Sequence, residues 1–137
     1  MRTIPDSNVI LDVVQPTQGW TNWSMRRLKE CMDGGGVVVN AIIYAEISGQ
    51  FPFHAEVTFL LKKLEVELED IPWDAAYLAG KSQRAYRGAG GMRERVLADF
   101  MIGAHAEQKG YRILTRDQAR YRTYFPRVDV IAPDTHP

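Results

Sequence analysis

Short apolar segments alternate with helical patterns along this chain, and that alternation limits its possible folds more than any other feature. We expect short strands at residues 2–5, 37–39, 111–115 and 128–131. Parallel strands need crossover connections, which are usually helices, and such strands are buried on both faces. The pattern therefore predicts an α/β fold, a three-layer α/β/α sandwich with a short, mainly parallel central sheet.

The helices are predicted from amphipathic spacing and from residues that cap helix ends. We expect helices over residues 8–14, 21–32, 41–48, 53–69, 75–86 and 93–109, and a helical turn over 118–124. Ser7 or Asn8 is expected to cap the first helix. In the helix over 53–69, an apolar stripe that includes Phe59 and Leu68 is expected to face one side.

The size and composition of the chain predict a single soluble unit. With 137 residues it can bury one core, so we expect one domain over residues 1–137, with the core within 2–132. No apolar run approaches the roughly 20 residues that cross a bilayer, and no secretory signal pattern is present. Cys31 is the only cysteine, which excludes an internal disulfide and a thiolate zinc cage. We therefore expect a cytoplasmic protein without a membrane segment.

Four acidic residues lie in or beside apolar segments, where an unpaired carboxylate is costly to bury. Asp6 and Asp117 follow two of the predicted strands, and Glu46 lies on the helix that follows another. Asp99 lies inside the apolar helical segment 96–104. Ligands of open parallel sheets bind beyond the carboxyl ends of the strands, so we expect these four side chains to meet there.

The type of these side chains indicates the chemistry of the site. Carboxylates close together repel one another, and a divalent cation would relieve that repulsion. Carboxylate oxygens without cysteine or clustered histidine suit Mg²⁺ or Mn²⁺ better than zinc. Such an ion polarises a phosphoryl oxygen and generates a hydroxide for attack. The acids therefore predict metal-dependent hydrolysis of a phosphodiester bond.

Each acid also has an ordinary structural interpretation. Asp6 and Asp117 can cap the helical segments that follow them, and Glu46 can be an exposed helix residue. Asp99 has the weakest alternative, because acids in the middle of a helix normally face water and its neighbours are apolar. Asp12 on the first helix is expected to be solvated or ion-paired. The metal interpretation is preferred because the other four acids occur as a set.

Charge is unevenly distributed, although the net charge is zero. Residues 1–80 carry more acidic than basic side chains, and residues 81–127 carry more basic ones. Arginines flank the glycine-rich segment 88–91 and also Asp117: Arg84, Arg87, Arg93 and Arg95, and then Arg116, Arg120 and Arg122. They are candidates for a rim that binds phosphates, and equally for ordinary surface arginines.

In an ordered set of residues, the chain resembles the PIN-domain ribonucleases. The set comprises Asp6-Ser7-Asn8, an isolated Glu46, Asp99 within Leu97–Ala104, and Leu114-Thr115-Arg116-Asp117. The closing segment 121–131 matches the end of the family, and the length is similar to that of the VapC toxins of bacterial toxin–antitoxin pairs. The resemblance implies an endoribonuclease that uses Mg²⁺ or Mn²⁺, a small inhibitory antitoxin, and a homodimer.

The resemblance also implies roles for the four acids as the catalytic residues. Asp6 and Asp99 would bind the metal directly, and Asp117 would bind it directly or through water. Glu46 would bind a second ion or position the attacking water.

Residues around these acids would have supporting roles. Thr115 would donate a hydrogen bond that orients Asp6 or Asp117, and Asn8 would act similarly unless it only caps the first helix. The RNA substrate would be bound by four arginines, Arg84, Arg87, Arg93 and Arg116.

Two rival functions use related features. A response-regulator receiver also gathers acids around Mg²⁺, but it needs an acidic pair near the first strand and a lysine after the last. Here Ser7 and Asn8 follow Asp6, and no lysine follows 128–131. The second rival is a non-catalytic module of the same fold that binds RNA or a protein partner. The complete set of acids argues against it.

Overall fold

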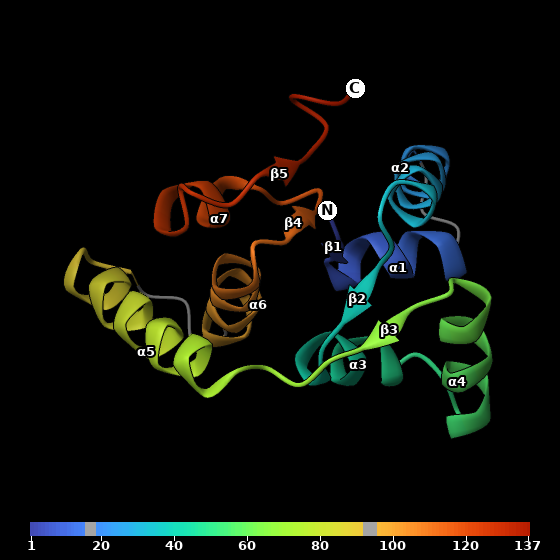
Figure 1. Cartoon of the computed structure of the whole chain (residues 1–137), viewed down its shortest axis with the longest axis horizontal. Coiled ribbons are helices and arrows are strands. Elements are labelled where there is room, and N and C mark those ends of the chain that lie inside the picture. Colours follow the sequence, from blue (N-terminus) through green and yellow to red (C-terminus); the bar gives the residue numbers. More distant parts are fainter. Residues whose placement is uncertain (16–18, 92–95) are drawn as a thin grey trace.

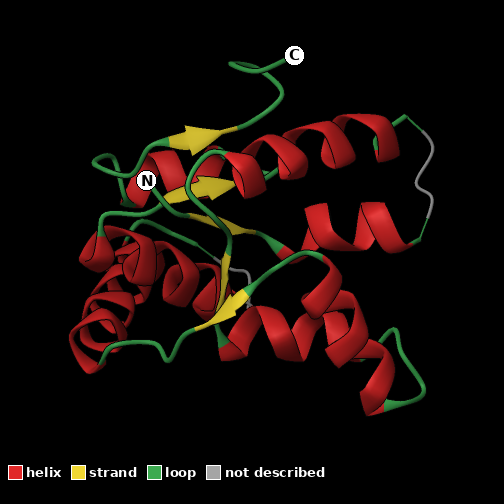
Figure 2. Ribbon diagram, turned by 45° about the vertical axis from the view of Figure 1, so that its right-hand side comes forward, coloured by secondary structure: helices red, strands yellow, loops and turns green. Residues whose placement is uncertain are grey.

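The computed structural model describes residues 1–15, 19–91 and 96–137, and its strands form two parallel sheet segments joined side by side (Figure 2). One segment has the order β1-β4-β5, and the other pairs β2 with β3. A parallel bridge between Thr3 and Val37 joins β1 to the residue before β2. The strands are β1 (Thr3–Pro5), β2 (Val38–Val39), β3 (Glu67–Leu68), β4 (Arg112–Leu114) and β5 (Val130–Ile131). The spatial order is therefore β3-β2-β1-β4-β5, all parallel.

Helices flank the strands on both sides (Figures 1 and 2). They are α1 (Ser7–Val14), α2 (Thr21–Asp33), α3 (Ala41–Ser48), α4 (His54–Lys63), α5 (Trp73–Gly88), α6 (Val96–Lys109) and α7 (Ala119–Tyr124). The arrangement confirms the predicted α/β sandwich with a short parallel sheet. None of the helices within the described ranges is long and apolar enough to cross a membrane.

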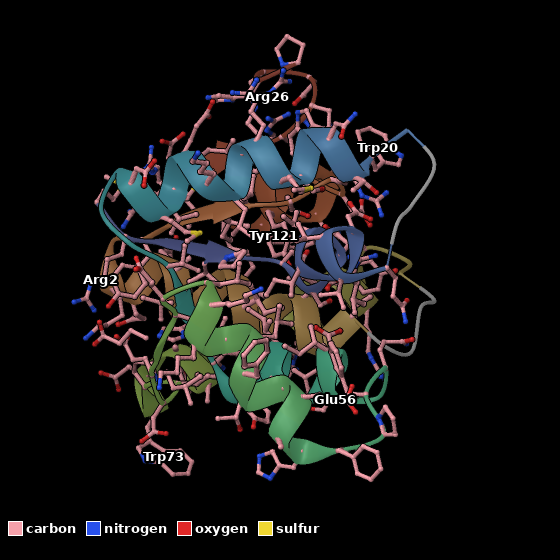
Figure 3. The ribbon with its side chains drawn as sticks, turned by 90° about the vertical axis from the view of Figure 1, so that its right-hand side faces the viewer. Arg2, Trp20, Arg26, Glu56, Trp73 and Tyr121 are labelled. Carbon is pink, nitrogen blue, oxygen red and sulfur yellow. The ribbon has the colours of Figure 1, made fainter. Side chains whose placement is uncertain are left out.

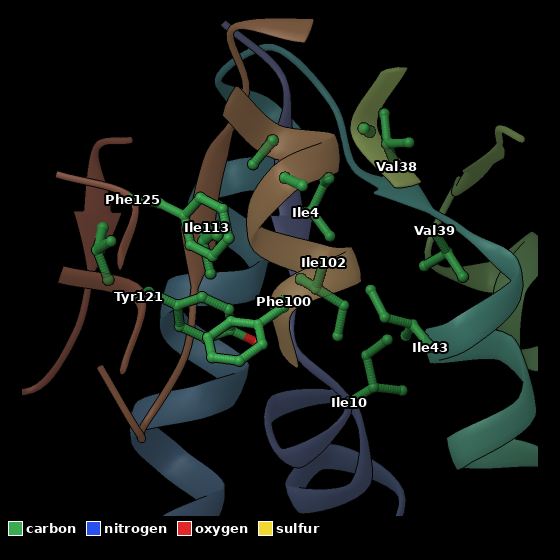
Figure 4. Packing of buried hydrophobic residues seen from close by; sticks show 14 of the residues in the cluster. Ile4, Ile10, Val38, Val39, Ile43, Phe100, Ile102, Ile113, Tyr121 and Phe125 are labelled. Carbon is green, nitrogen blue, oxygen red and sulfur yellow. The ribbon is translucent and has the colours of Figure 1, made fainter. Parts of the chain in front are cut away.

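Neighbouring strand residues point into two different cores, as expected for a sheet covered on both faces. Ile113 and Val130 belong to the larger core, which includes Phe100 of α6 (Figure 4). Leu114 and Ile131, the next residue along each strand, belong to the smaller core with α1 and α2. The alternation fixes which side chains of β4 and β5 face each layer.

The prediction of a helix over residues 53–69 is wrong at the C-terminal end of that range. The helix α4 ends at Lys63, and Glu65 adopts a left-handed φ of 52° that turns the chain. The next residues form β3, whose backbone Glu67 N donates to Val37 O over 2.9 Å. The prediction that Phe59 and Leu68 belong to one apolar stripe of this helix is also wrong. Phe59 is 63% exposed and Leu68, which lies in β3, is 60% exposed. Pairing with β2 therefore outweighs the helical tendency of this segment.

A buried polar contact fixes where α3 begins. The Asn40 side chain accepts hydrogen bonds from the backbone N–H groups of Ile42 and Ile43, which makes it the N-cap. Its amide nitrogen lies 3.0 Å from His105 Nδ1. Since that nitrogen can only donate, Nδ1 accepts, and the His105 proton lies on Nε2, which donates to Glu69 over 2.9 Å. The network anchors the helix that carries Glu46.

Candidate functional site

The sheet topology brings the ends of β1 and β4 together, because these strands are parallel neighbours. Asp6 follows β1 directly, and its backbone N–H donates to Leu114 O over 2.8 Å. Asp117 follows β4 by three residues. Both acids therefore lie at the carboxyl edge of the sheet, where the sequence pattern placed them.

Asp6 is the most deeply buried of the four acids, with 6% of its surface exposed. One carboxylate oxygen accepts from the Ser7 backbone over 2.8 Å, so Asp6, rather than Ser7 or Asn8, caps α1. The other oxygen accepts from the hydroxyls of Thr115 and Tyr121, each over 3.0 Å. Burial raises the pKa of Asp6, while these hydrogen bonds lower it. Three donors therefore hold the carboxylate in one orientation.

Thr115 is the hub that connects the end of β4 to the beginning of α1. Its hydroxyl, fully buried, also accepts from the Asp117 backbone N–H over 3.0 Å and from the Asn8 amide over 3.3 Å. The Asn8 oxygen accepts from the Arg116 backbone N–H over 3.3 Å. Asn8 thus links two segments that lie about a hundred residues apart in the chain.

Asp99 is held by an arginine. In α6 it forms an ion pair with Arg120, whose guanidinium also lies 5.7 Å from the centre of the Tyr86 ring. The pKa of Asp99 is raised, first by burial and then by the negative charge of Asp6, and Arg120 opposes both effects. Asp99 is thus close enough to Asp6 for the charge of Asp6 to raise the pKa of Asp99.

Glu46 lies on α3 and is exposed. Partial burial of its carboxyl raises its pKa, and the charges of Asp6 and Asp99 raise it further. The charge of Asp117, also exposed, raises the pKa of Asp6 and of Asp99. Asp6 and Asp99 thus act on Glu46, and Asp117 acts on Asp6 and Asp99, so the four acids lie in one region of the molecule.

The donor set suits a hard divalent cation, since it consists of carboxylate oxygens that raise one another's pKa. As the side chains stand, no three His, Cys, Asp or Glu residues in the described ranges are close enough to hold an ion. An ion held by Asp6, Asp99 and a third such residue would therefore require side-chain movement.

Tyr121 and Arg120 are site residues that the sequence pattern did not identify as such. Tyr121 is 1% exposed, lies in the centre of the molecule (Figure 3), and packs beside Phe100 (Figure 4). Burial raises its pKa well above the ordinary value, and the nearby carboxylates, Asp6 foremost, raise it further. The phenol therefore stays protonated and donates to Asp6 at neutral pH. Its position after Asp117 in α7 was the only available signal.

The arginines flanking Asp117 are engaged by acids within the chain. Arg116 donates to both oxygens of the buried Asp12, over 2.7 and 3.0 Å, and stacks 5.1 Å from the centre of the Trp20 ring. Asp12 was expected to be either solvated or ion-paired, and the structure shows that it is ion-paired. This pairing does not test whether Arg116 contacts RNA, and that expectation stays a prediction.

The arginines of the glycine-rich segment differ from those around Asp117. Arg84 and Arg87 are exposed on α5 and remain available for an anionic partner. Arg93 lies outside the described residues. Arg122, like Arg116 and Arg120, pairs with a carboxylate, in this case Asp134.

The electrostatics of Glu46 predict a pH-dependent effect on stability. Its folded-state pKa lies above the ordinary value of 4.5, so ionised Glu46 costs stability at neutral pH. Glu46→Gln should therefore raise the unfolding temperature of the protein in EDTA at pH 7. Below pH 4.5 the carboxyl is increasingly neutral in both states, and the gain should fade. Thermal unfolding from pH 3.5 to 8 measures this difference.

A matched control for this prediction is Glu56→Gln on α4, at the edge of the molecule (Figure 3). Glu56 lies in the first turn of α4, where a negative charge is favourable. Its replacement should leave the unfolding temperature unchanged or slightly lower. A lower unfolding temperature for Glu46→Gln at pH 7 would mean that Glu46 is not in a repulsive environment.

Comparisons with known proteins identify the family and the fold of the chain. A family model described as PIN domain matches residues 3–126. Among curated protein sequences, no match was found.

Several solved structures have a similar fold. VapBC2 from Rickettsia felis, bound to a DNA fragment from the promoter, aligns with a TM-score of 0.72 at 12% identity, covering 96% of this chain and 98% of that one. FitAcB from Neisseria gonorrhoeae aligns with a TM-score of 0.68 at 20% identity, covering 98% and 99%. A toxin–antitoxin complex from Klebsiella pneumoniae aligns with a TM-score of 0.66 at 15% identity, covering 87% and 89%. At these identities the likeness establishes the fold.

Proposed function

This chain belongs to the PIN domain family, and from that premise we propose that it is a divalent-metal-dependent endoribonuclease, the toxin of a toxin–antitoxin pair. The observation that carries the proposal is the buried Asp6 carboxylate, oriented by Thr115 and Tyr121 and influenced by the charge of Asp117. A carboxylate fixed in this way beside further carboxylates is arranged for a cation rather than for packing.

The proposed roles follow from these positions. Asp6 and Asp99 bind Mg²⁺ or Mn²⁺, with Asp117 beside them or connected through water. A bound ion of this kind supplies a Lewis acid for the phosphoryl oxygen and an activated water. Glu46, on the exposed side of the site, positions that water or binds a second ion.

The residues around the acids keep the geometry constant. Thr115 and Tyr121 donate to one oxygen of Asp6 and leave its orientation fixed. Asn8 holds the beginning of α1 against the end of β4. These contacts reduce the reorganisation that the site needs during the reaction.

The RNA would approach along the basic second half of the chain. Arg84, Arg87 and Arg116 are the described candidates for phosphate contacts, and Arg93, outside the described residues, remains a prediction. We also retain the prediction of a single nuclease domain over residues 1–137.

The partner proposal rests on the solved structures, one of which is described as a toxin–antitoxin complex. A small antitoxin would bind this chain, which would itself form a homodimer. A hollow of about 400 Å³ beside α2 and α4 offers a surface for an apolar segment of such a partner. Its apolar lining comes from Val13, Met25, Leu28, Met32 and Leu64.

Cleavage of RNA by the purified chain tests the proposed function. In Mg²⁺, a mixture of structured and unstructured RNAs should be cut at internal positions. EDTA should abolish the cleavage, and Mg²⁺ in excess over EDTA should restore it. The reason is that the attacking water is activated by the bound ion and not by the carboxylates alone. Binding of RNA without cleavage in Mg²⁺ or Mn²⁺ would favour the non-catalytic module instead.

A further inference from the structure

The first turn of α7 contacts two of the site's carboxylates. Its residues Arg120 and Tyr121 are consecutive, and they contact Asp99 and Asp6 respectively. Among the described residues, Arg120 is the only basic side chain that forms an ion pair with any of the four acids. The site therefore contains a positive charge supplied by its own chain.

The ion pair between Arg120 and Asp99 is not an ordinary surface pair. The Arg120 side chain is 16% exposed and that of Asp99 is 29% exposed. The guanidinium also lies over the Tyr86 ring, so it is held from two directions. Exposed ion pairs contribute little, but a partly buried pair with a fixed arginine is screened less by solvent.

Arg120 and a divalent cation would compete for the same carboxylate. The guanidinium donates to Asp99 Oδ2, and it would repel a divalent cation bound to the same carboxylate. Building on the proposed function, we propose that Arg120 is the internal counter-ion of this site. It neutralises Asp99 when no metal is bound and releases Asp99 when the metal binds.

This exchange has two consequences of opposite sign. Arg120 stabilises the metal-free protein, because it offsets the repulsion between Asp99 and Asp6. It weakens metal binding, because the ion must displace it. A residue with only a packing role would change the first quantity and not the second.

Titration of the protein with Mn²⁺ tests the proposal. Binding is measured by calorimetry and by the electron paramagnetic resonance of the free ion. Arg120→Gln should bind Mn²⁺ about tenfold more tightly than the wild type, equivalent to about 1.4 kcal/mol. Its unfolding temperature in EDTA should be lower than that of the wild type.

Arg122→Gln is the matched control. It removes the same charge from the same helix, but its partner is Asp134, outside the cluster of four acids. Its Mn²⁺ affinity should stay within about twofold of the wild type, because exposed charges are screened. A tenfold gain in this variant as well would overturn the specific role of Arg120.

A second measurement follows the wild-type protein itself, and a variant is needed only to assign one signal. In the NMR spectrum, the Nε–H signal of Arg120 is assigned by its absence in Arg120→Lys. This signal should shift in the wild-type protein as Mg²⁺ is added. A signal that stays constant while Mg²⁺ binds would overturn the exchange.

The two proposals fail in different ways. Equal Mn²⁺ affinities for the wild type and Arg120→Gln, with affinity lost in Asp99→Asn, would refute the counter-ion and retain the metal site. No Mn²⁺ binding by the wild type or by Arg120→Gln would refute both.

Discussion

Asp99→Asn is expected to reduce RNA cleavage by more than about a hundredfold while leaving the fold intact, since a metal ligand contributes several kcal/mol of transition-state stabilisation. Asparagine has the same size and can still accept a hydrogen bond from Arg120. It lacks the negative charge that a divalent cation requires. Single-turnover cleavage rates in saturating Mg²⁺, together with the unfolding temperature, separate the two effects.

Asp134→Asn is the control for this change. It makes the same substitution and removes the same type of ion pair, here with Arg122 at the exposed surface. Its cleavage rate should match that of the wild type. Full RNase activity in the double variant Asp6→Ala, Asp99→Ala would refute the proposed mechanism, because no metal could then be held by these two acids.

Gly103→Ala is expected to destabilise the protein by about 1–3 kcal/mol, the usual cost of overpacking a core. A Cβ at Gly103 would lie 2.3 Å from Cδ2 of the Phe125 ring, which is fully buried. Phe125 directly follows α7, so it cannot move away without disturbing the helix that carries Arg120 and Tyr121. Urea unfolding measures the free energy of the variant.

The same substitution at Gly80 on α5 should have the opposite sign. A Cβ at Gly80 would contact nothing within 4 Å, and the residue lies within a helix. Gly80→Ala should therefore stabilise the protein by about 0.5–1 kcal/mol, because alanine loses less backbone entropy. A Gly103→Ala variant as stable as the wild type would contradict the close approach of α6 to Phe125.

The parts of the fold that follow from local pattern were predictable from the sequence. The strands β1, β2, β4 and β5 consist mostly of buried apolar residues, and helical segments connect them. The strand β3 was missed because both of its residues, Glu67 and Leu68, are exposed, and only pairing with β2 defines it. The end of α4 was missed because Glu65 is not a residue that usually adopts a positive φ.

The positions of the candidate site residues in the fold could be predicted to a similar extent. Strand-end positions identified Asp6 and Asp117, and an apolar neighbourhood identified Asp99. Tyr121 was missed because it lies 115 residues from Asp6 in the sequence, so only tertiary packing brings the two together. The pairing of Arg116 with the buried Asp12 could not be predicted either, because these residues are also far apart in the sequence.

Whether these carboxylates hold a divalent cation is tested most directly by anomalous diffraction at the manganese edge, from crystals of the protein grown with Mn²⁺. We expect an anomalous peak in contact with carboxylate oxygens of Asp6 and Asp99, with Arg120 withdrawn from Asp99. A peak that lies elsewhere in the molecule, or no peak at a Mn²⁺ concentration that supports RNA cleavage, would contradict the metal site.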